Sequence, residues 1–123
     1  MSHSAWLSPA ETGLRPQVAH GGPGEVLAAR ALARAEGGLA FVDFVVVPPG
    51  VAVGRHTHGQ DEELYIIIDG CAEVVVDDEQ RTVRSGDVVH NRAGGTHELR
   101  NDGPDPLRMV VVDVRPGQEP AEP

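Results

Sequence analysis

The sequence predicts an all-β fold made of short strands. Valine-rich and isoleucine-rich runs alternate with turn residues, and the 123 residues include 15 glycines and 10 prolines. This composition favours strands joined by tight turns over a helical bundle. The length fits one domain with a single core. We expect that domain to span residues 25–114, between an N-terminal arm at 1–24 and a C-terminal tail at 115–123.

The arm and the segment after it carry the weakest structural signal. Residues 1–24 mix Ser, Pro, Gly and polar residues without periodicity, so we expect partial order at most. The arm's His3 and His20 have no partner at ligand spacing, which predicts solvent-exposed side chains. Alanines and leucines at residues 25–36 suit a helix, but the helical periodicity is poor. We favour an edge strand there.

From residue 39 onward the pattern predicts one strand after another. Pro49 followed by Gly50 favours a type II turn, and Asp69 followed by Gly70 favours a two-residue hairpin. The expected strands are Leu39–Val47, Val51–His58, Leu64–Asp69, Cys71–Asp77, Arg81–Arg84, Asp87–Asn91, a strand that starts at His97, and Leu107–Val114.

Charge and hydropathy exclude several classes of partner. The net charge is −9 without a basic cluster, which argues against nucleic acid and anionic membranes. No apolar run approaches 18 residues and no signal-peptide pattern is present, so a cytoplasmic location is expected. All ten basic residues are arginines. Schiff-base chemistry and lysine general bases are therefore excluded.

A metal-ligand spacing lies in the strand predicted around residues 51–58. His56 and His58 project from the same side of an extended strand, where both can reach one ion. Imidazole suits Zn, Cu, Fe and Ni, and a carboxylate from the following Glu62-Glu63 pair adds an oxygen that Mn or Fe(II) also accepts. Gly54 lies on the same face, and we expect it to leave open space beside the metal.

Two glycine-anchored motifs resemble the two signatures of the cupin family. The first runs Gly50, five residues, His56-x-His58, four residues, Glu63, six residues, Gly70. The second runs Gly86, five residues, Arg92-x-Gly94, two residues, His97, three residues, Asn101. It departs from the family only at Arg92, which stands where the family has proline. Together the motifs cover about half of the chain.

The resemblance implies a fold and a metal site. The expected fold is a double-stranded β-helix, or jelly roll, that encloses one divalent metal ion: Fe, Mn, Ni, Zn or Cu. Carried over position by position, the ligands would be His56, His58, Glu63 and His97. Glu62 competes with Glu63, because the family allows three or four intervening residues. We favour Glu63, which alone stands six residues before Gly70.

Such a ligand set has chemical consequences. Three neutral imidazoles and one carboxylate around a divalent ion leave a net charge of about +1, which favours an anionic or oxygen-rich ligand. An octahedral ion keeps about two open positions. By resemblance we expect a metal-dependent enzyme of dioxygenase, isomerase, epimerase or cyclase type, acting on a small oxygen-rich metabolite. The alternative is a cupin module that binds a small ligand or metal without turnover.

Further residues are candidates to hold or activate a substrate. Tyr65 shares a strand face with Glu63, so it is either a proton donor near the metal or an aromatic that fills the core. Arg92 is either a carboxylate clamp or a solvated loop arginine. His90 is either a general base or a support for the metal ligands, if its strand face points inward, or an ordinary strand histidine. Candidates to line an apolar pocket, or simply to fill the core, are Ile67, Leu99, Met109 and Val111.

The opposite face of the strand that carries Glu63 predicts an interface. Leu64, Ile66 and Ile68 alternate with Glu63, Tyr65 and Ile67, so they form an apolar strip outside the barrel if Glu63 points inward. An apolar strip of this kind must be covered. The expected cover is a homodimer interface or a bound N-terminal segment, and the strip is the main reason to expect a homodimer.

Overall fold

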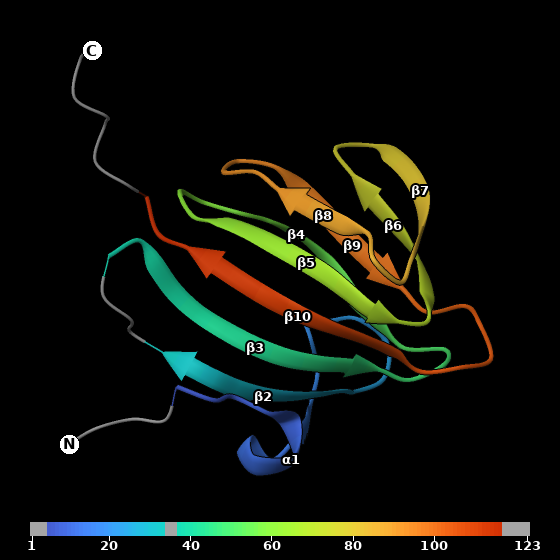
Figure 1. The fold of residues 1–123 in the computed structure, drawn as a ribbon. Helices are drawn as coiled ribbons and strands as arrows, with labels where there is room; N and C mark the ends of the chain where they lie inside the picture. The colour runs from blue at the N-terminus through green and yellow to red at the C-terminus, as the bar shows by residue number, and fades with distance from the viewer. Residues whose placement is uncertain (1–4, 34–36, 117–123) are drawn as a thin grey trace.

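The computed structural model describes residues 5–33 and 37–116, and it consists of two antiparallel sheets packed face to face (Figure 1). The six-stranded sheet has the order β1 (Arg15–Gln17), β2 (Val26–Ala33), β3 (Leu39–Val47), β10 (Leu107–Val114), β5 (Glu62–Asp69), β8 (Val88–Asn91). The four-stranded sheet has the order β4 (Ala52–Thr57), β9 (Thr96–Arg100), β6 (Cys71–Val76), β7 (Glu79–Arg84). The all-β prediction and the double-stranded β-helix implied by the resemblance are confirmed.

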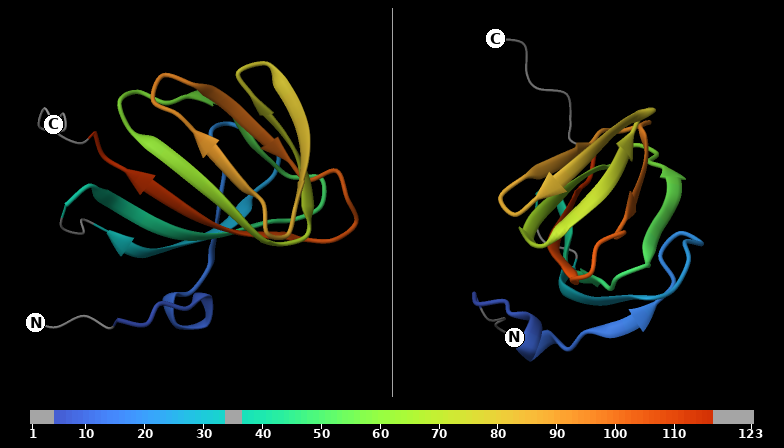
Figure 2. Two further views of the ribbon diagram at one scale, coloured as in Figure 1. Left: turned by 45° about the horizontal axis from the view of Figure 1, so that its top comes forward. Right: turned by 90° about the vertical axis from the view of Figure 1, so that its right-hand side faces the viewer.

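Most strands lie where the sequence predicts them. The ambiguous segment at 25–36 contributes strand β2, which pairs with β3, while residues 34–36 lie outside the described residues. Part of the N-terminal arm is regular too. A single helical turn, α1 (Pro9–Thr12), is capped by Ser8, and β1 then pairs with β2. Figure 2 shows this arm beside the barrel and the two sheets curving around a common interior.

The two predicted turns have different outcomes. The type II turn is confirmed: Val51 N donates to Pro48 O at 3.1 Å, and Gly50 has φ +79°. The hairpin at Asp69-Gly70 is wrong, because β5 and β6 belong to different sheets. Gly70 instead turns the chain from one sheet to the other, with φ +91°. A local dipeptide pattern cannot distinguish a hairpin from such a corner.

The interior divides into an apolar part and a polar end. The fully buried side chains include Val47, Ile67, Leu99 and Leu107, and they join one hydrophobic cluster between the sheets. Buried polar side chains gather elsewhere on the inner faces and are His58, Glu63, Asn91, His97, Asn101 and Asp113. Asn101 is held by hydrogen bonds to the carbonyls of Val47 and Asp105, both at 2.8 Å. The other groups surround the candidate site.

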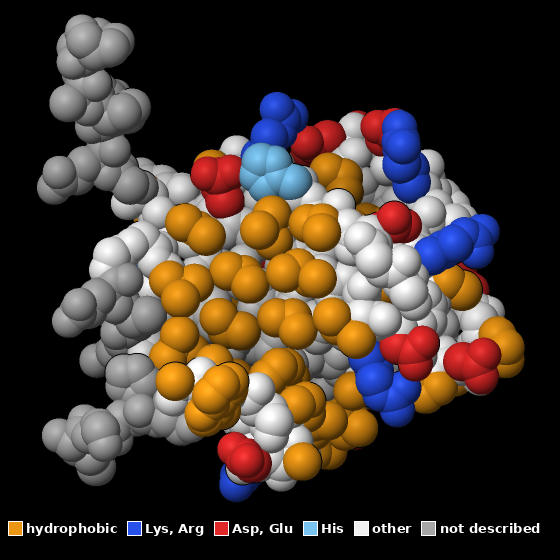
Figure 3. Space-filling model, in the orientation of Figure 1, with side chains coloured by type: hydrophobic (Ala, Val, Ile, Leu, Met, Phe, Trp, Pro, Cys, Tyr) orange, Lys and Arg blue, Asp and Glu red, His pale blue; other side chains and the backbone are white. Residues whose placement is uncertain are grey.

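The outer face of the six-stranded sheet is apolar across several strands. Figure 3 shows it as a broad patch of hydrophobic side chains. Strand register aligns this face in two cross-strand rows, which are Ala29, Phe44, Val110, Ile66, Val88 and Leu32, Val42, Val112, Leu64, His90. His90 is the one polar member of the two rows. In residues 5–33 and 37–116, no helix is long and apolar enough to cross a membrane.

Candidate metal centre

Three strands bring the four predicted ligands together. His56 lies on β4 directly opposite His97 on β9, and His58 follows the last residue of β4. Glu63 enters from β5 in the other sheet, where it lies inside the barrel and is 8% exposed. One nitrogen or oxygen from each of these four residues lies within 4.8 Å of the others. The cluster can therefore hold a metal ion.

The distances and the ring arrangement define the cluster. Nε2 of His58 lies 3.5 Å from Glu63 Oε1, and Nε2 of His97 lies 3.8 Å from the same oxygen. The His56 and His97 rings meet edge to face with centroids 4.1 Å apart. The His58 and His97 rings are 4.7 Å apart. Two imidazoles thus approach one carboxylate oxygen, and the third packs against them within reach of the same ion.

The hydrogen bonds of two histidines leave the coordinating nitrogens free. His56 donates from Nδ1 to the Gly54 carbonyl at 2.8 Å, and His58 donates from Nδ1 to Asp61 at 3.1 Å. In both rings Nε2 then carries the lone pair, which is the tautomer that a metal needs. His58 Nε2 is buried without a hydrogen-bond partner. An orphaned buried acceptor is costly, so the donor set fits a divalent ion.

The protonation state of the imidazoles also suits metal binding. Burial lowers the pKa of His97 to about 3 and lowers the pKa of His56 below its usual range. Both rings are therefore neutral at physiological pH and can donate a lone pair without first losing a proton. Burial raises the pKa of Glu63, which a nearby cation would reverse. A cation bound at the site would therefore stabilise the ionised carboxylate of Glu63.

Two further acids extend the cluster on one side. Asp61 is hydrogen-bonded to Nδ1 of His58, and Asp113 lies opposite Glu63 in the strand register. Asp61 and Asp113 form a second group with His58 that could hold a metal ion. Burial and the hydrogen bond to Asp61 raise the pKa of Asp113 to about 8. The same bond lowers the pKa of Asp61. At neutral pH one proton is therefore retained between these two carboxyl groups, on Asp113.

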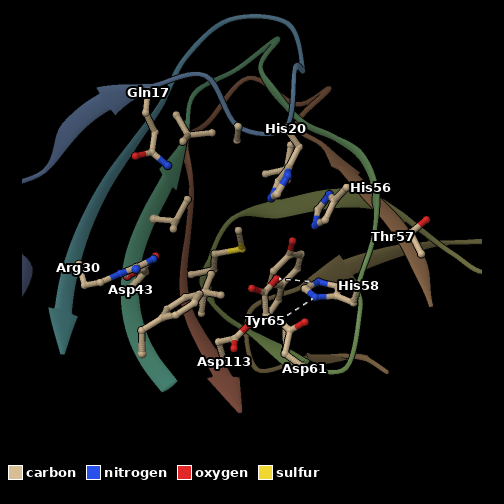
Figure 4. Close-up of a pocket in the computed structure, with 18 of the residues that line it drawn as sticks. Gln17, His20, Arg30, Asp43, His56, Thr57, His58, Asp61, Tyr65 and Asp113 are labelled. Carbon is tan, nitrogen blue, oxygen red and sulfur yellow. Dashed lines mark hydrogen bonds and ion pairs between the residues drawn. The ribbon is translucent and has the colours of Figure 1, made fainter. Parts of the chain in front are cut away.

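A cavity of about 390 Å³ opens beside the cluster. Figure 4 shows His20, His56 and His58 on one wall, with Arg30 and Asp43 on the opposite wall. Arg30 contacts Asp43 through two hydrogen bonds, at 2.8 and 3.1 Å. Tyr65 and Met109 also line the cavity. Its polar and charged lining suits a small oxygen-rich molecule better than an apolar one.

Some of the remaining predicted site residues line this cavity, and the others lie in the hydrophobic core. Tyr65 is buried with its hydroxyl oxygen 3.0 Å from His97 Nε2, and burial raises its pKa well above the usual value. Met109 and Val111 line the cavity. Ile67 and Leu99 lie instead in the hydrophobic core. Tyr65 is thus a protonated hydrogen-bond donor next to the candidate ligands.

The structure separates the open alternatives at Glu62, His90 and Arg92. Glu62 points outward and pairs with His90 at 2.6 Å, so neither residue reaches the cluster. Arg92 lies outside the cavity, 71% exposed and 3.7 Å from Asp77. The geometry therefore favours Glu63 over Glu62, the plain strand histidine for His90 and the surface loop arginine for Arg92.

Two expectations about the entrance of the cavity are wrong in whole or in part. His20 is exposed, as expected, but it is not without a partner, because its ring stacks on His56 with centroids 3.4 Å apart. Gly54, expected to leave space beside the metal, packs against the backbone of the N-terminal segment, and a Cβ there would lie 2.8 Å from Gly22 N. The space beside Gly54 is filled by the segment that carries His20. His3 lies outside the described residues.

Sequence reasoning missed Arg30, Asp43, Asp61 and Asp113 as well as His20. Partial signals exist for some of them. Asp43 and Asp113 interrupt apolar strands at positions that share the inward face of the strand, and Arg30 is the cross-strand partner of Asp43. The run His20-Gly21-Gly22 could have indicated a close backbone approach. The partners of these residues come from distant parts of the chain, which local patterns do not specify.

The fold and the cluster together define a double-stranded β-helix protein with a candidate His-Glu metal centre. The profile of the family described as "Cupin domain" matches residues 43–113, well over half of the chain. The chain belongs to the cupin family. This agrees with the resemblance seen in the two sequence motifs.

Comparisons with curated proteins give partial matches. The chain is 34% identical over 70 residues to an oxalate-binding protein of Thermotoga maritima, covering 55% of this chain and 56% of the relative. It is 30% identical over 71 residues to an uncharacterized protein of Methanocaldococcus jannaschii, covering 58% of this chain and 57% of that one. A 29% identical match to the alginate biosynthesis protein AlgA of Pseudomonas putida covers 62% of this chain and 16% of AlgA. The chain thus spans little more than half of the first two relatives.

Solved structures match over most of the chain. A crystal structure described as a predicted oxalate decarboxylase from Thermotoga maritima superposes with a TM-score of 0.85 at 25% identity, covering 89% of this chain and 98% of the other. A cupin 2 conserved barrel domain protein from Salinispora arenicola gives a TM-score of 0.70 at 27% identity, covering 92% and 88%. The similarity therefore extends beyond the segment matched by the family profile.

Proposed function

We propose that this cupin binds one divalent metal ion through His56, His58, Glu63 and His97, and that the loaded centre acts on a small oxygen-rich metabolite. The observation that carries the proposal is the convergence of three histidines on Glu63, with a buried and unpaired Nε2 on His58. A bound ion would supply Lewis acidity that polarises an oxygen of the ligand.

The residues around the cluster support this substrate class. Tyr65 keeps its proton and can donate a hydrogen bond to a developing negative charge. Asp61 is ionised and can accept a hydrogen bond from a ligand hydroxyl, while Asp113, whose proton is shared with Asp61, adds a further carboxyl oxygen as acceptor. Donors and acceptors of both kinds suit a hydroxylated or carboxylated metabolite.

Oxalate is the first compound to test. A relative at 34% identity is called an oxalate-binding protein, and the structure with a TM-score of 0.85 is described as a predicted oxalate decarboxylase. Two vicinal oxygens of oxalate could occupy the two positions that four protein ligands leave on an octahedral ion. The reaction types that fit the family remain proposals: oxygen-dependent cleavage, isomerisation or epimerisation, and cyclisation.

A binding module without turnover is the second candidate. The name of the 34% identical relative describes binding rather than catalysis, which favours this alternative for a site of the same kind. Four protein ligands can also complete a tetrahedral zinc site, which leaves no position for a substrate. The ion and its coordination number therefore distinguish the two functions.

The test begins with protein stripped by a chelator and titrated separately with Fe²⁺, Mn²⁺, Co²⁺, Ni²⁺, Cu²⁺ and Zn²⁺ by calorimetry. We expect one equivalent to bind. Oxalate is then titrated into loaded and metal-free protein, with oxygen consumption and product formation followed in parallel. Metal-dependent turnover of oxalate or of a related hydroxy acid would support the enzyme, and stoichiometric binding without turnover would support the module. Failure of every ion to bind would overturn the metal centre.

A further inference from the structure

A short N-terminal segment, residues 19–23, is bound to the edge of β4 at the entrance of the cavity. Gly54 N donates to Ala19 O at 2.9 Å, and Ala52 N donates to Pro23 O at 3.2 Å. These bonds join the segment to the strand that carries His56. The segment is therefore an addition to the four-stranded sheet at the site itself.

Close packing fixes the position of this segment. Cβ atoms built at Gly22 and Gly54 would overlap the backbone of the facing segment, including the carbonyls of Ala52 and His20. Only glycine at both positions permits this approach. His20 itself has φ +50°, which is uncommon for a residue with a side chain. Such a conformation persists where surrounding contacts hold it, and it often marks a functional site.

The result of this packing is a stacked pair of imidazoles. The His20 and His56 rings lie 3.4 Å apart at their centroids, with an angle of 10° between their planes. His56 is thus held at one edge by the Gly54 carbonyl, on one face by His20, and against His97 by an edge-to-face contact.

We propose that His20 is a positioning residue of the metal centre, whose ring face fixes the ring plane of His56 so that Nε2 stays directed at the shared ion. His20 is not among the four residues whose atoms cluster within 4.8 Å, so it acts through His56 rather than as a ligand. The inference rests on the proposed metal function. It assigns to the N-terminal segment a role that neither cupin motif includes.

The test uses the full chain and Co²⁺ alone as the probe. Three variants are compared with the wild type: His20→Ala removes the ring, His20→Phe keeps an aromatic face without nitrogens, and His90→Ala removes a histidine from the outer face. Affinity is measured by calorimetry, and ligand geometry by the visible absorption spectrum of bound Co²⁺. Loss of a group that orients a ligand typically lowers metal affinity by about 10- to 100-fold.

We expect His20→Ala to weaken Co²⁺ binding by at least about tenfold and to change its spectrum. His20→Phe should restore both properties, and His90→Ala should match the wild type. Wild-type affinity and spectrum in His20→Ala would overturn the inference while leaving the metal centre intact. Equal losses in His20→Ala and His20→Phe would overturn it too, because the ring nitrogens would then matter rather than the stacked face. No binding by the wild type would overturn both proposals.

Discussion

Alternate residues of β5 face two different environments. The inward residues Glu63, Tyr65 and Ile67 are each at most 8% exposed, and they run from the metal cluster to the hydrophobic core. The outward residues Leu64 and Ile66 are partly buried, and Ile68 is 54% exposed. Beyond Glu62, the outward side chains are thus apolar yet poorly covered, while the inward ones include an acid and a phenol that are deeply buried.

This contrast reverses the usual arrangement of a half-buried strand. Antiparallel sheets commonly bury an apolar face and expose a polar one. On β5 the polar groups are buried because they serve the cavity, and the apolar face extends across β3 and β10 without charge in its central rows (Figure 3). The difference teaches that the buried polar groups of β5 belong to the candidate site, whereas its outer residues contribute to an apolar surface.

The largest effect is expected when one carboxylate is neutralised on each face of β5. Glu63→Gln removes the inward carboxylate while keeping its shape, and we expect Co²⁺ affinity to fall on the order of 100-fold, about 2.7 kcal/mol. The matched control Glu62→Gln changes the outward neighbour that pairs with His90, and its affinity should stay within about twofold of the wild type. Calorimetric titration measures both.

Equal losses in these two variants would contradict the assignment of Glu63 as the ligand. So would wild-type affinity in Glu63→Gln. Circular dichroism of each variant checks that the barrel remains folded.

The outer face is tested by placing a charge in the middle of an apolar row. We propose that a second copy of this chain covers this face, because a two-fold dimer buries the same apolar patch of both subunits against each other. Ile66→Glu should then weaken self-association at least about tenfold, about 1.4 kcal/mol, because an unpaired carboxylate would be buried at the interface. Light scattering across a concentration series measures the change.

Metal affinity should stay at the wild-type value in Ile66→Glu, since residue 66 points away from the cluster. A wild-type protein that is monomeric at high micromolar concentration would contradict the dimer and leave the metal centre untouched.

The smallest expected effect concerns pH. The pKa of His97 is about 3 in the folded protein and 6.5 in the unfolded chain. Between pH 6.5 and 5.5 this residue therefore becomes protonated in the unfolded chain and stays neutral in the native protein. The free energy of unfolding of metal-free protein should therefore fall through this residue as the pH falls, by about 1 kcal/mol over that unit. Urea unfolding at both pH values measures it.

Comparison with His97→Gln isolates this contribution. Asp113, whose pKa is raised to about 8, acts in the opposite direction, because the native protein holds its proton above the pH at which the unfolded chain releases it. That opposing effect is present in both proteins. Identical pH slopes for the wild type and His97→Gln would contradict the depressed pKa of His97.

Local patterns predicted much of the barrel and the first ligands. Alternation along β5 placed Glu63 and Tyr65 on one face and Leu64 and Ile66 on the other, and the type II turn at Gly50 followed from two adjacent residues. The cupin motifs then joined His97 to the cluster across forty residues, which geometry along one strand could not do. The Asp69-Gly70 hairpin failed because the same dipeptide also suits a corner between sheets.

The sequence by itself determined most of the strands and their inner and outer faces, because side-chain alternation and turn conformation depend on neighbouring residues. The four candidate ligands followed from the resemblance to the two cupin motifs. Only the tertiary structure decided that Arg30 meets Asp43, that Asp113 lies beside Glu63, and that His20 stacks on His56. These contacts depend on strand register and on how closely one backbone can approach another. Both are set by packing between segments far apart in the chain, which no local pattern encodes.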